Sequence, residues 1–257
     1  MKRFLFQGDS ITDASRDRAW QTDLGKGYAM IMASSVTSKF PGEFEFINKG
    51  VSGDRIVDIY QRIKADILNL KPDYMSLLVG INDLWHEYCH NNGVDAVKFE
   101  KIYCMLIEEI KEALPDIKII LLEPFVLKGG PAPWGGEGTI PHWEEFKSDI
   151  LIRAEIVKRI AEKYKLSFVP LKEEFDKLGE KYGNHVWVID GVHPTPAGYA
   201  VIAEKLEEAT ETHGVDFAIA TFASTNGQMA DEFAEEYCTS CGFGDGDKEG
   251  AALLFIT

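Results

Sequence analysis

The sequence predicts an α/β protein in which about five mostly parallel strands form a sheet between two layers of helices. Short apolar runs alternate along the chain with segments whose apolar residues recur every three or four positions. Strands separated by helices form βαβ units, which build helix-covered parallel sheets. In addition, a polar turn that contains glycine follows each of the first three runs, at residues 8–10, 50–53 and 80–83.

Each expected strand is a short apolar run bounded by polar residues, and the five runs cover residues 3–7, 43–48, 73–79, 117–123 and 167–171. The expected helices share the three-and-four spacing and cover residues 25–40, 54–70, 98–114, 144–165 and 195–213. In the third of these, Ile102, Leu106 and Ile110 lie on one face. Because ligands bind beyond the carboxyl ends of the strands in such sheets, the polar turns are expected to share one edge.

A change of character after residue 214 predicts a main domain of residues 1–214 and an acidic extension of residues 215–257. The extension contains eight acidic residues and one basic residue. Its Cys238 and Cys241 are read as ordinary thiols, because a structural zinc site normally needs four ligands and no second cysteine pair follows. No function is assigned to the extension. Residues 124–143, rich in Gly, Pro and Trp, are expected to form a loop over the site or a plain solvent loop.

The charge balance bears on the kind of partner that the protein binds. A net charge of −15, from 42 acidic and 27 basic residues, argues against nucleic acid and against an anionic membrane surface. The N-terminal apolar run is broken at residues 8–10, too early for a secretory signal. No run approaches the roughly 20 apolar residues of a spanning helix. We therefore expect a cytoplasmic protein that acts on a small molecule.

Three residues have the side chains that nucleophilic catalysis requires. Ser10 lies at an expected strand-to-helix turn, which exposes a hydroxyl group. A serine hydroxyl is a weak nucleophile until a base removes its proton, and histidine suits this task because its ordinary pKa lies near neutrality. His193 follows Asp190 by three residues, so that one turn delivers a base and the carboxylate that fixes its tautomer. The alternatives are a helix cap at Ser10 and a histidine without a catalytic role.

Three hydrogen-bond donors are expected at the same edge of the sheet: the backbone N–H of Ser10, the backbone N–H of Gly53 and the side-chain amide of Asn82. Attack on an ester places negative charge on the carbonyl oxygen. A preorganised donor aimed at that oxygen is worth about 3–4 kcal/mol. The alternatives are a turn glycine at Gly53 and an Asx turn of Asn82 with Asp83.

The order of these residues resembles that of the SGNH (GDSL-like) hydrolases. The stretches that match the four motifs of the family are Gly8-Asp9-Ser10, Gly50-Val51-Ser52-Gly53-Asp54, Gly80-Ile81-Asn82-Asp83 and Asp190-Gly191-Val192-His193-Pro194. The resemblance covers about residues 1–213 and departs at Ile11, where the name-giving motif has leucine. It implies a flavodoxin-like three-layer α/β/α sandwich and a serine esterase that uses no metal or cofactor. It also implies Ser10 as nucleophile, His193 as base and Asp190 as its orienting carboxylate.

A narrower resemblance is to the bacterial intracellular acetylxylan esterases and related carbohydrate deacetylases. The similar stretches are Asn48–Gly53, Gly80–Trp85 with Tyr88, Glu123-Pro124-Phe125 and His193–Tyr199. This resemblance implies a carboxylic ester hydrolase that removes acetyl groups from xylo-oligosaccharides through an acyl-enzyme, and it implies a homo-oligomer. A lysophospholipase or short-chain thioesterase on the same scaffold is the alternative, and a non-catalytic binding module is an alternative of a different class.

Substrate contacts are expected from Asp9, Trp85, Tyr88 and Trp134. Aromatic side chains stack on sugar rings, whereas a long-chain lipase needs an apolar groove for its acyl chain. The alternative is that these aromatic residues belong to the core or to a lid.

Overall fold

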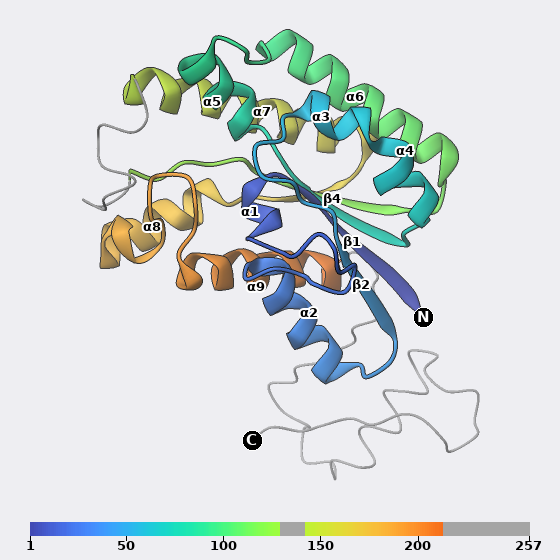
Figure 1. The fold of residues 1–257 in the computed structure, drawn as a ribbon. Coiled ribbons are helices and arrows are strands. Elements are labelled where there is room, and N and C mark those ends of the chain that lie inside the picture. The colour runs from blue at the N-terminus through green and yellow to red at the C-terminus, as the bar shows by residue number, and fades with distance from the viewer. Residues whose placement is uncertain (129–141, 213–257) are drawn as a thin grey trace, which may run out of the picture. The chain divides into compact units, whose positions relative to one another are not determined.

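A computed structural model of the chain describes residues 1–128 and 142–212. These residues form a five-stranded parallel sheet with the strand order β2-β1-β3-β4-β5 (Figure 1). The strands are β1 (Lys2–Gly8), β2 (Phe44–Asn48), β3 (Tyr74–Leu78), β4 (Lys118–Leu122) and β5 (Ser167–Val169). Each strand overlaps the run in which it is expected, and the predicted α/β fold class is confirmed.

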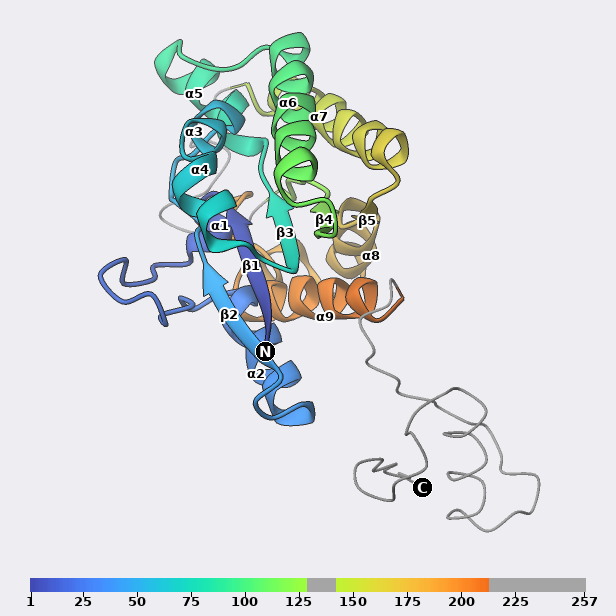
Figure 2. The same ribbon diagram turned by 90° about the vertical axis from the view of Figure 1, so that its right-hand side faces the viewer.

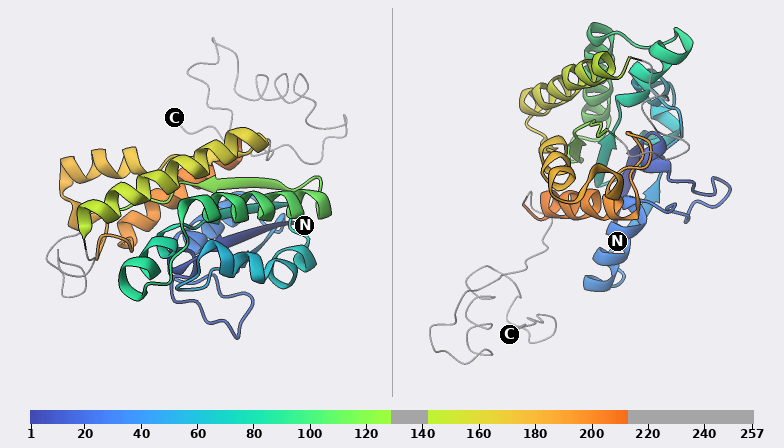
Figure 3. Two further views of the ribbon diagram at one scale, coloured as in Figure 1. Left: turned by 90° about the horizontal axis from the view of Figure 1, so that it is seen from above. Right: turned by 90° about the vertical axis from the view of Figure 1, so that its left-hand side faces the viewer.

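Helices cover both faces of the sheet in the described residues. One layer contains α3 (Ile56–Gln61), α4 (Ile63–Asp66), the 3-10 turn η1 (Leu68–Leu70), α5 (Ile81–His90), α6 (Ala96–Ala113) and α7 (Trp143–Tyr164). The opposite layer contains α2 (Tyr28–Lys39), α8 (Lys172–Tyr182), the 3-10 turn η2 (Asn184–Val186) and α9 (Pro196–Thr212), with α2 packed on α9 (Figure 2). Viewed from above, α6 and α7 lie side by side over the sheet (Figure 3). The four-residue helix α1 (Ser10–Asp13) directly follows β1.

Alternation of side chains along the strands supplies a separate apolar surface to each helical layer. Leu5 of β1 and Leu77 of β3 belong to a buried cluster that also includes Phe99 of α6. On the other face, Phe6 of β1 packs edge-on against the ring of Tyr28 in α2, with ring centroids 5.8 Å apart. Burial of each such side chain stabilises the fold by about 1.5–3 kcal/mol. Both faces of the central strands are therefore apolar, as in other helix-covered parallel sheets.

Two differences from the expected elements have a physical reason. The single helix expected at 54–70 is broken at Arg62, whose backbone at φ −104° and ψ 13° separates α3 from α4. The guanidinium of Arg62 binds the carboxylates of Asp54 and Asp66. These side-chain contacts stabilise the chain at the break between the two short helices. Apolar spacing also does not predict α8, because only Phe175 and Gly179 are buried in it.

The strand order reverses at β1, since the chain passes from β1 to β2 on one side and returns to β3 on the other. In parallel sheets of this order, ligands bind beyond the carboxyl ends of the strands at this switch point. None of the described helices is both long and apolar enough to cross a membrane. The extension expected at 215–257 and most of the loop expected at 124–143 lie outside the described residues, so the predicted domain boundary stays a prediction.

Candidate active site

Ser10 is the first residue of α1. It follows a tight turn that has no room for a side chain at Gly8. A Cβ atom at Gly8 would lie 2.3 Å from Oγ1 of Thr12 and 2.4 Å from the carbonyl oxygen of Leu78. The carboxylate of Asp9 caps α1 by accepting a hydrogen bond of 3.0 Å from the N–H of Ile11. The end of β1 and the cap of α1 thus place the half-buried Ser10 at the carboxyl edge of the sheet.

Asp190 and His193 lie in one closed turn before α9. Val188 and Pro194 form an antiparallel bridge, and the N–H of Ile189 donates to the carbonyl oxygen of His193 at 2.8 Å. Gly191 has φ +93°, in the left-handed region that glycine adopts without strain. One carboxylate oxygen of Asp190 accepts the N–H of His193 at 2.7 Å. The turn is therefore held by its own hydrogen bonds.

The structure brings Ser10, His193 and Asp190 into one line of hydrogen bonds. Oγ of Ser10 lies 2.9 Å from Nε2 of His193, and Nδ1 of His193 lies 2.6 Å from Oδ2 of Asp190. In the tautomer with its proton on Nδ1, His193 donates to Asp190 and accepts from the Ser10 hydroxyl. This arrangement can remove the serine proton as the oxygen attacks an electrophile.

The electrostatics of this line agree with its geometry. The hydrogen bond to Asp190 raises the pKa of His193 above its usual value, although burial opposes the rise. Burial alone would raise the pKa of Asp190, but the hydrogen bond and charge of His193 outweigh it and hold that pKa below its usual value. Each partner thus favours the charged form of the other.

Asp9 is 1% exposed, and burial raises the pKa of its carboxyl to about 7. The same carboxyl group caps α1. Contact of Asp9 with substrate stays a prediction. Its ionised form still favours protonated His193 through the charge between them.

Gly53 follows β2 and Asn82 follows β3. Gly53 has φ +90°, which again favours glycine. Asn82 lies in the first turn of α5, and its side-chain Nδ2 donates to the carbonyl oxygen of Asp54 at 3.2 Å. Since an amide nitrogen carries two hydrogens, one donor of Asn82 remains for a ligand.

Three residues that shape this part of the site are missed by sequence reasoning. Asp83 is fully buried, and both of its carboxylate oxygens lie 3.2 Å from the N–H of Ile56. Arg62 binds the carboxylate of Asp54 and the side-chain oxygen of Gln7, both at 2.8 Å. Burial lowers the pKa of His86, and the backbone of Gly53 opposes this shift. Of these three residues, Asp83 alone stands in a matched motif, which is the one signal that the sequence offers.

The aromatic residues expected to contact substrate have partners within the protein. Trp85 packs edge-on against Phe146 of α7, with ring centroids 6.4 Å apart. The hydroxyl of Tyr88 donates to Asp149 at 2.9 Å, and burial, followed by this bond, raises the pKa of Tyr88 to about 12. Trp134 lies outside the described residues. Contact of these three residues with substrate stays a prediction.

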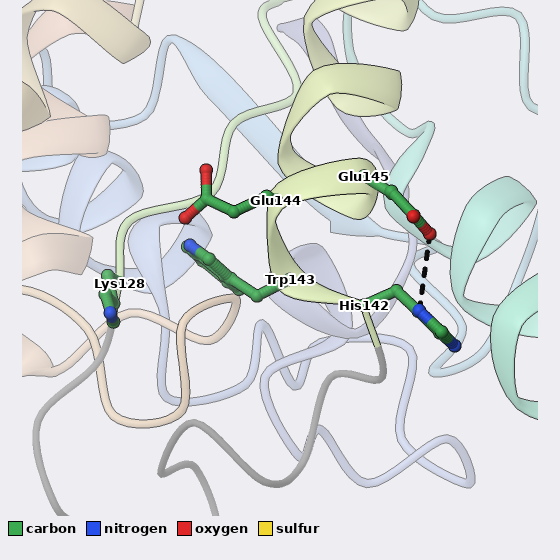
Figure 4. A pocket seen from close by; sticks show the side chains of 5 residues that line it. All are labelled: Lys128, His142, Trp143, Glu144 and Glu145. Atoms are coloured by element: carbon green, nitrogen blue, oxygen red, sulfur yellow. Dashed lines mark ion pairs between the residues drawn. The ribbon is translucent and has the colours of Figure 1, made fainter.

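A groove of about 340 Å³ lies at the start of α7, lined by Lys128, His142, Trp143, Glu144 and Glu145. Trp143 and Glu144 point toward Lys128, whereas His142 pairs with Glu145 on the other side (Figure 4). The N–H of the neighbouring Leu127 donates to the carbonyl oxygen of Gly191 at 3.1 Å, which ties this part of the chain to the turn of His193. Within the described residues, no three His, Cys, Asp or Glu side chains gather as a metal-binding group.

Comparison with known proteins identifies the family of this chain. The model of the GDSL-like lipase/acylhydrolase family matches residues 6–201. The acetylxylan esterase of Geobacillus stearothermophilus is 28% identical over 213 residues, which cover 79% of this chain and 90% of that protein. Its crystal structure superposes with a TM-score of 0.70 and covers 81% of this chain and 93% of its own.

A protein from Parabacteroides merdae, described as a GDSL-like lipase, has a TM-score of 0.74 at 29% identity. The match covers 82% of this chain and 95% of that protein. With the family model spanning most of the described residues, the idea of a non-catalytic binding module loses its support. The chain belongs to the GDSL-like lipase/acylhydrolase family and is a carboxylic ester hydrolase.

Proposed function

We propose that this enzyme hydrolyses small acyl esters of carbohydrates, acetyl esters above all, through an acyl-enzyme on Ser10. The observation that carries the proposal is the continuous line of hydrogen bonds from Ser10 through His193 to Asp190, at 2.9 and 2.6 Å. In this proposal Asp190 orients the imidazole, and the N–H groups of Ser10 and Gly53 act with the amide of Asn82 as the oxyanion hole.

The first half of the reaction forms the acyl-enzyme. The oxygen of Ser10 bonds to the ester carbonyl carbon while its proton passes to Nε2 of His193. The carbonyl oxygen becomes negatively charged and accepts hydrogen bonds from the three donors. The bond from the carbon to the alcohol oxygen then breaks, and His193 returns its proton to that oxygen. The alcohol leaves, and the acyl group stays on Ser10.

The second half releases the acid. A water molecule gives a proton to His193 as its oxygen attacks the acyl carbon. The bond to the Ser10 oxygen breaks, and the same proton returns to that oxygen. Asp190 stabilises the imidazolium in both halves, which agrees with the raised pKa of His193. The 41% exposed side chain of His193 leaves the base accessible to alcohol and water.

Two observations support a carbohydrate ester as substrate. The relative from Geobacillus stearothermophilus is an acetylxylan esterase, and the match covers 90% of it. In addition, the groove at the start of α7 combines the Trp143 ring with the Lys128 ammonium and the Glu144 carboxylate. A ring that stacks on a sugar, beside charged groups that bind hydroxyls, suits an oligosaccharide better than an acyl chain.

The nucleophile can be tested with a fluorophosphonate probe, which reacts with activated serines. We expect the wild type to be labelled and the Ser10→Ala variant to remain unlabelled. The matched control is Ser34→Ala, since the Ser34 hydroxyl lies in α2 and donates to the carbonyl oxygen of Met30. Equal labelling of Ser10→Ala and wild type would contradict the assignment of Ser10.

The substrate can be tested by comparing kcat/KM on acetylated xylo-oligosaccharides, a lysophospholipid and a short-chain thioester. We expect the acetylated sugar to be preferred, and Trp143→Ala to raise its KM while leaving hydrolysis of p-nitrophenyl acetate unchanged. Trp20→Ala serves as control, because Trp20 is 67% exposed and lies outside the groove lining. A preference for the lysophospholipid would replace the carbohydrate ester with the lysophospholipase alternative. The expected homo-oligomer and cytoplasmic location stay predictions, and light scattering tests the first.

A further inference from the structure

The first turn of α5 holds the backbone just after Gly53 at two points. Asn82 donates to the carbonyl oxygen of Asp54 at 3.2 Å. The next residue, Asp83, accepts the N–H of Ile56 with both carboxylate oxygens, each at 3.2 Å. The segment that carries the proposed oxyanion donor Gly53 is therefore held by the same helix that carries the donor Asn82.

Asp83 is the buried member of this set. Its side chain is 0% exposed, and its backbone carbonyl accepts the N–H of Val94 at 2.9 Å. Arg153 of α7 is 5% exposed, donates to the carbonyl oxygen of Val94 at 2.9 Å and attracts the Asp83 carboxylate by its charge. Contacts within α5 and with α7 thus fix the position of Asp83, whose carboxylate in turn binds the start of α3.

Loss of the Asp83 carboxylate would have a defined consequence. The N–H of Ile56 is buried, and a buried donor without an acceptor costs about 1–3 kcal/mol. The start of α3 would shift to find another acceptor, and Gly53 stands only three residues before it. Because a displacement of about 1 Å at a reacting centre can lower the rate by about 100-fold, a small shift of Gly53 matters for catalysis.

We propose that Asp83 is a positioning residue, which fixes the oxyanion donors Gly53 and Asn82 relative to each other by holding the start of α3 against the start of α5. The proposal rests on the proposed function, because it concerns the donors assigned there. Asp83 itself touches neither substrate nor the reacting atoms. Its effect is on the transition state, and it leaves binding of the ground-state ester almost unchanged.

The test compares Asp83→Ala and Asp83→Asn with wild type, using p-nitrophenyl acetate and a trifluoromethyl ketone that adds to the active serine as an oxyanion. Rates are divided by the concentration of active sites that fluorophosphonate titrates, so that misfolded protein does not count. The matched control is Glu123→Ala. Glu123 also accepts backbone N–H groups at a helix start, those of Leu171 and Lys172 at 2.7 and 2.8 Å, but this helix is α8.

We expect Asp83→Ala to lower kcat about tenfold or more, with KM within about twofold of wild type. The inhibition constant of the ketone should rise by the same factor as kcat falls. Asp83→Asn keeps one acceptor oxygen for the N–H of Ile56. Its kcat and ketone affinity should therefore lie between those of wild type and Asp83→Ala. Glu123→Ala should lose thermal stability but keep kcat per active site.

The proposal is overturned if Asp83→Ala keeps the wild-type kcat and ketone affinity per active site, whatever its stability. Should Asp83→Ala fail to fold, Asp83→Asn decides: an unchanged kcat and ketone affinity overturns the proposal, and a parallel loss of both supports it. A failure of the proposed function looks different, because the wild type would then show neither ester turnover nor labelling at Ser10, and both proposals would fall together.

Discussion

The two sides of the active site are built in different ways. On one side, Asp190 and His193 belong to one turn, whose own backbone hydrogen bonds close it. On the other side, Gly53 and Asn82 come from separate crossovers. The buried side chains of Asp83 in α5 and Arg153 in α7 hold the backbone around them. The proposed acid–base side is a local structure, whereas the proposed oxyanion side depends on tertiary packing. Substitutions at positions distant in sequence should therefore alter the placement of Gly53 and Asn82 but leave the turn of Asp190 and His193 unchanged.

The largest expected effect concerns the local side. His193→Ala removes the base, and kcat/KM for p-nitrophenyl acetate should fall by about 10⁴-fold or more. Thermal stability should change little, because the His193 side chain is 41% exposed and the turn is closed by backbone bonds. Steady-state kinetics together with a melting curve check this. A fall of less than about tenfold would show that another group serves as base.

A smaller effect is expected on the other side. Asn82→Ala removes one oxyanion donor, and kcat should fall by about 10²- to 10³-fold with little change in KM. Since Asn82 also donates to the Asp54 carbonyl, melting temperature should fall as well, unlike that of His193→Ala. If the loss appeared in KM alone, Asn82 would bind the ground state rather than the oxyanion.

The smallest effect is a shift in pH dependence. His193 accepts a proton only when neutral, so kcat/KM falls as the pH drops through its pKa. The hydrogen bond to Asp190 raises that pKa, and activity is therefore lost at a higher pH than for an ordinary histidine. Asp190→Asn removes this stabilisation of the imidazolium and should move the acidic limb of the kcat/KM profile to lower pH. An unmoved limb would mean that Asp190 does not set the pKa of His193.

The same contrast explains what the sequence predicts and what it does not. The turn of Asp190 and His193 is predictable, since the two residues stand three apart with a glycine between them and two prolines shortly after. Ser10, Gly53 and Asn82 are predictable because each follows a recognisable strand, and parallel strands end at one edge. The strands themselves are evident from their apolar runs.

The supporting contacts could not be predicted in the same way. Asp83 meets Ile56 across 27 positions of the chain, and Arg153 lies 59 positions from its acceptor Val94. Nothing in local spacing pairs such residues, because their partners depend on how α3, α5 and α7 pack. The burial of Asp9 could not be predicted from the sequence either, because it depends on packing around α1. In the sequence, a carboxylate beside Ser10 indicates only a candidate for substrate contact.

The nucleophile and its three proposed oxyanion donors are tested together by a crystal structure of the enzyme after reaction with a fluorophosphonate. We expect a covalent bond from Ser10 Oγ to phosphorus, with the phosphonyl oxygen within hydrogen-bond distance of the Ser10 N–H, the Gly53 N–H and the Asn82 amide. His193 should still contact Asp190. Phosphorus attached to another residue, or a phosphonyl oxygen turned away from those donors, would contradict this expectation.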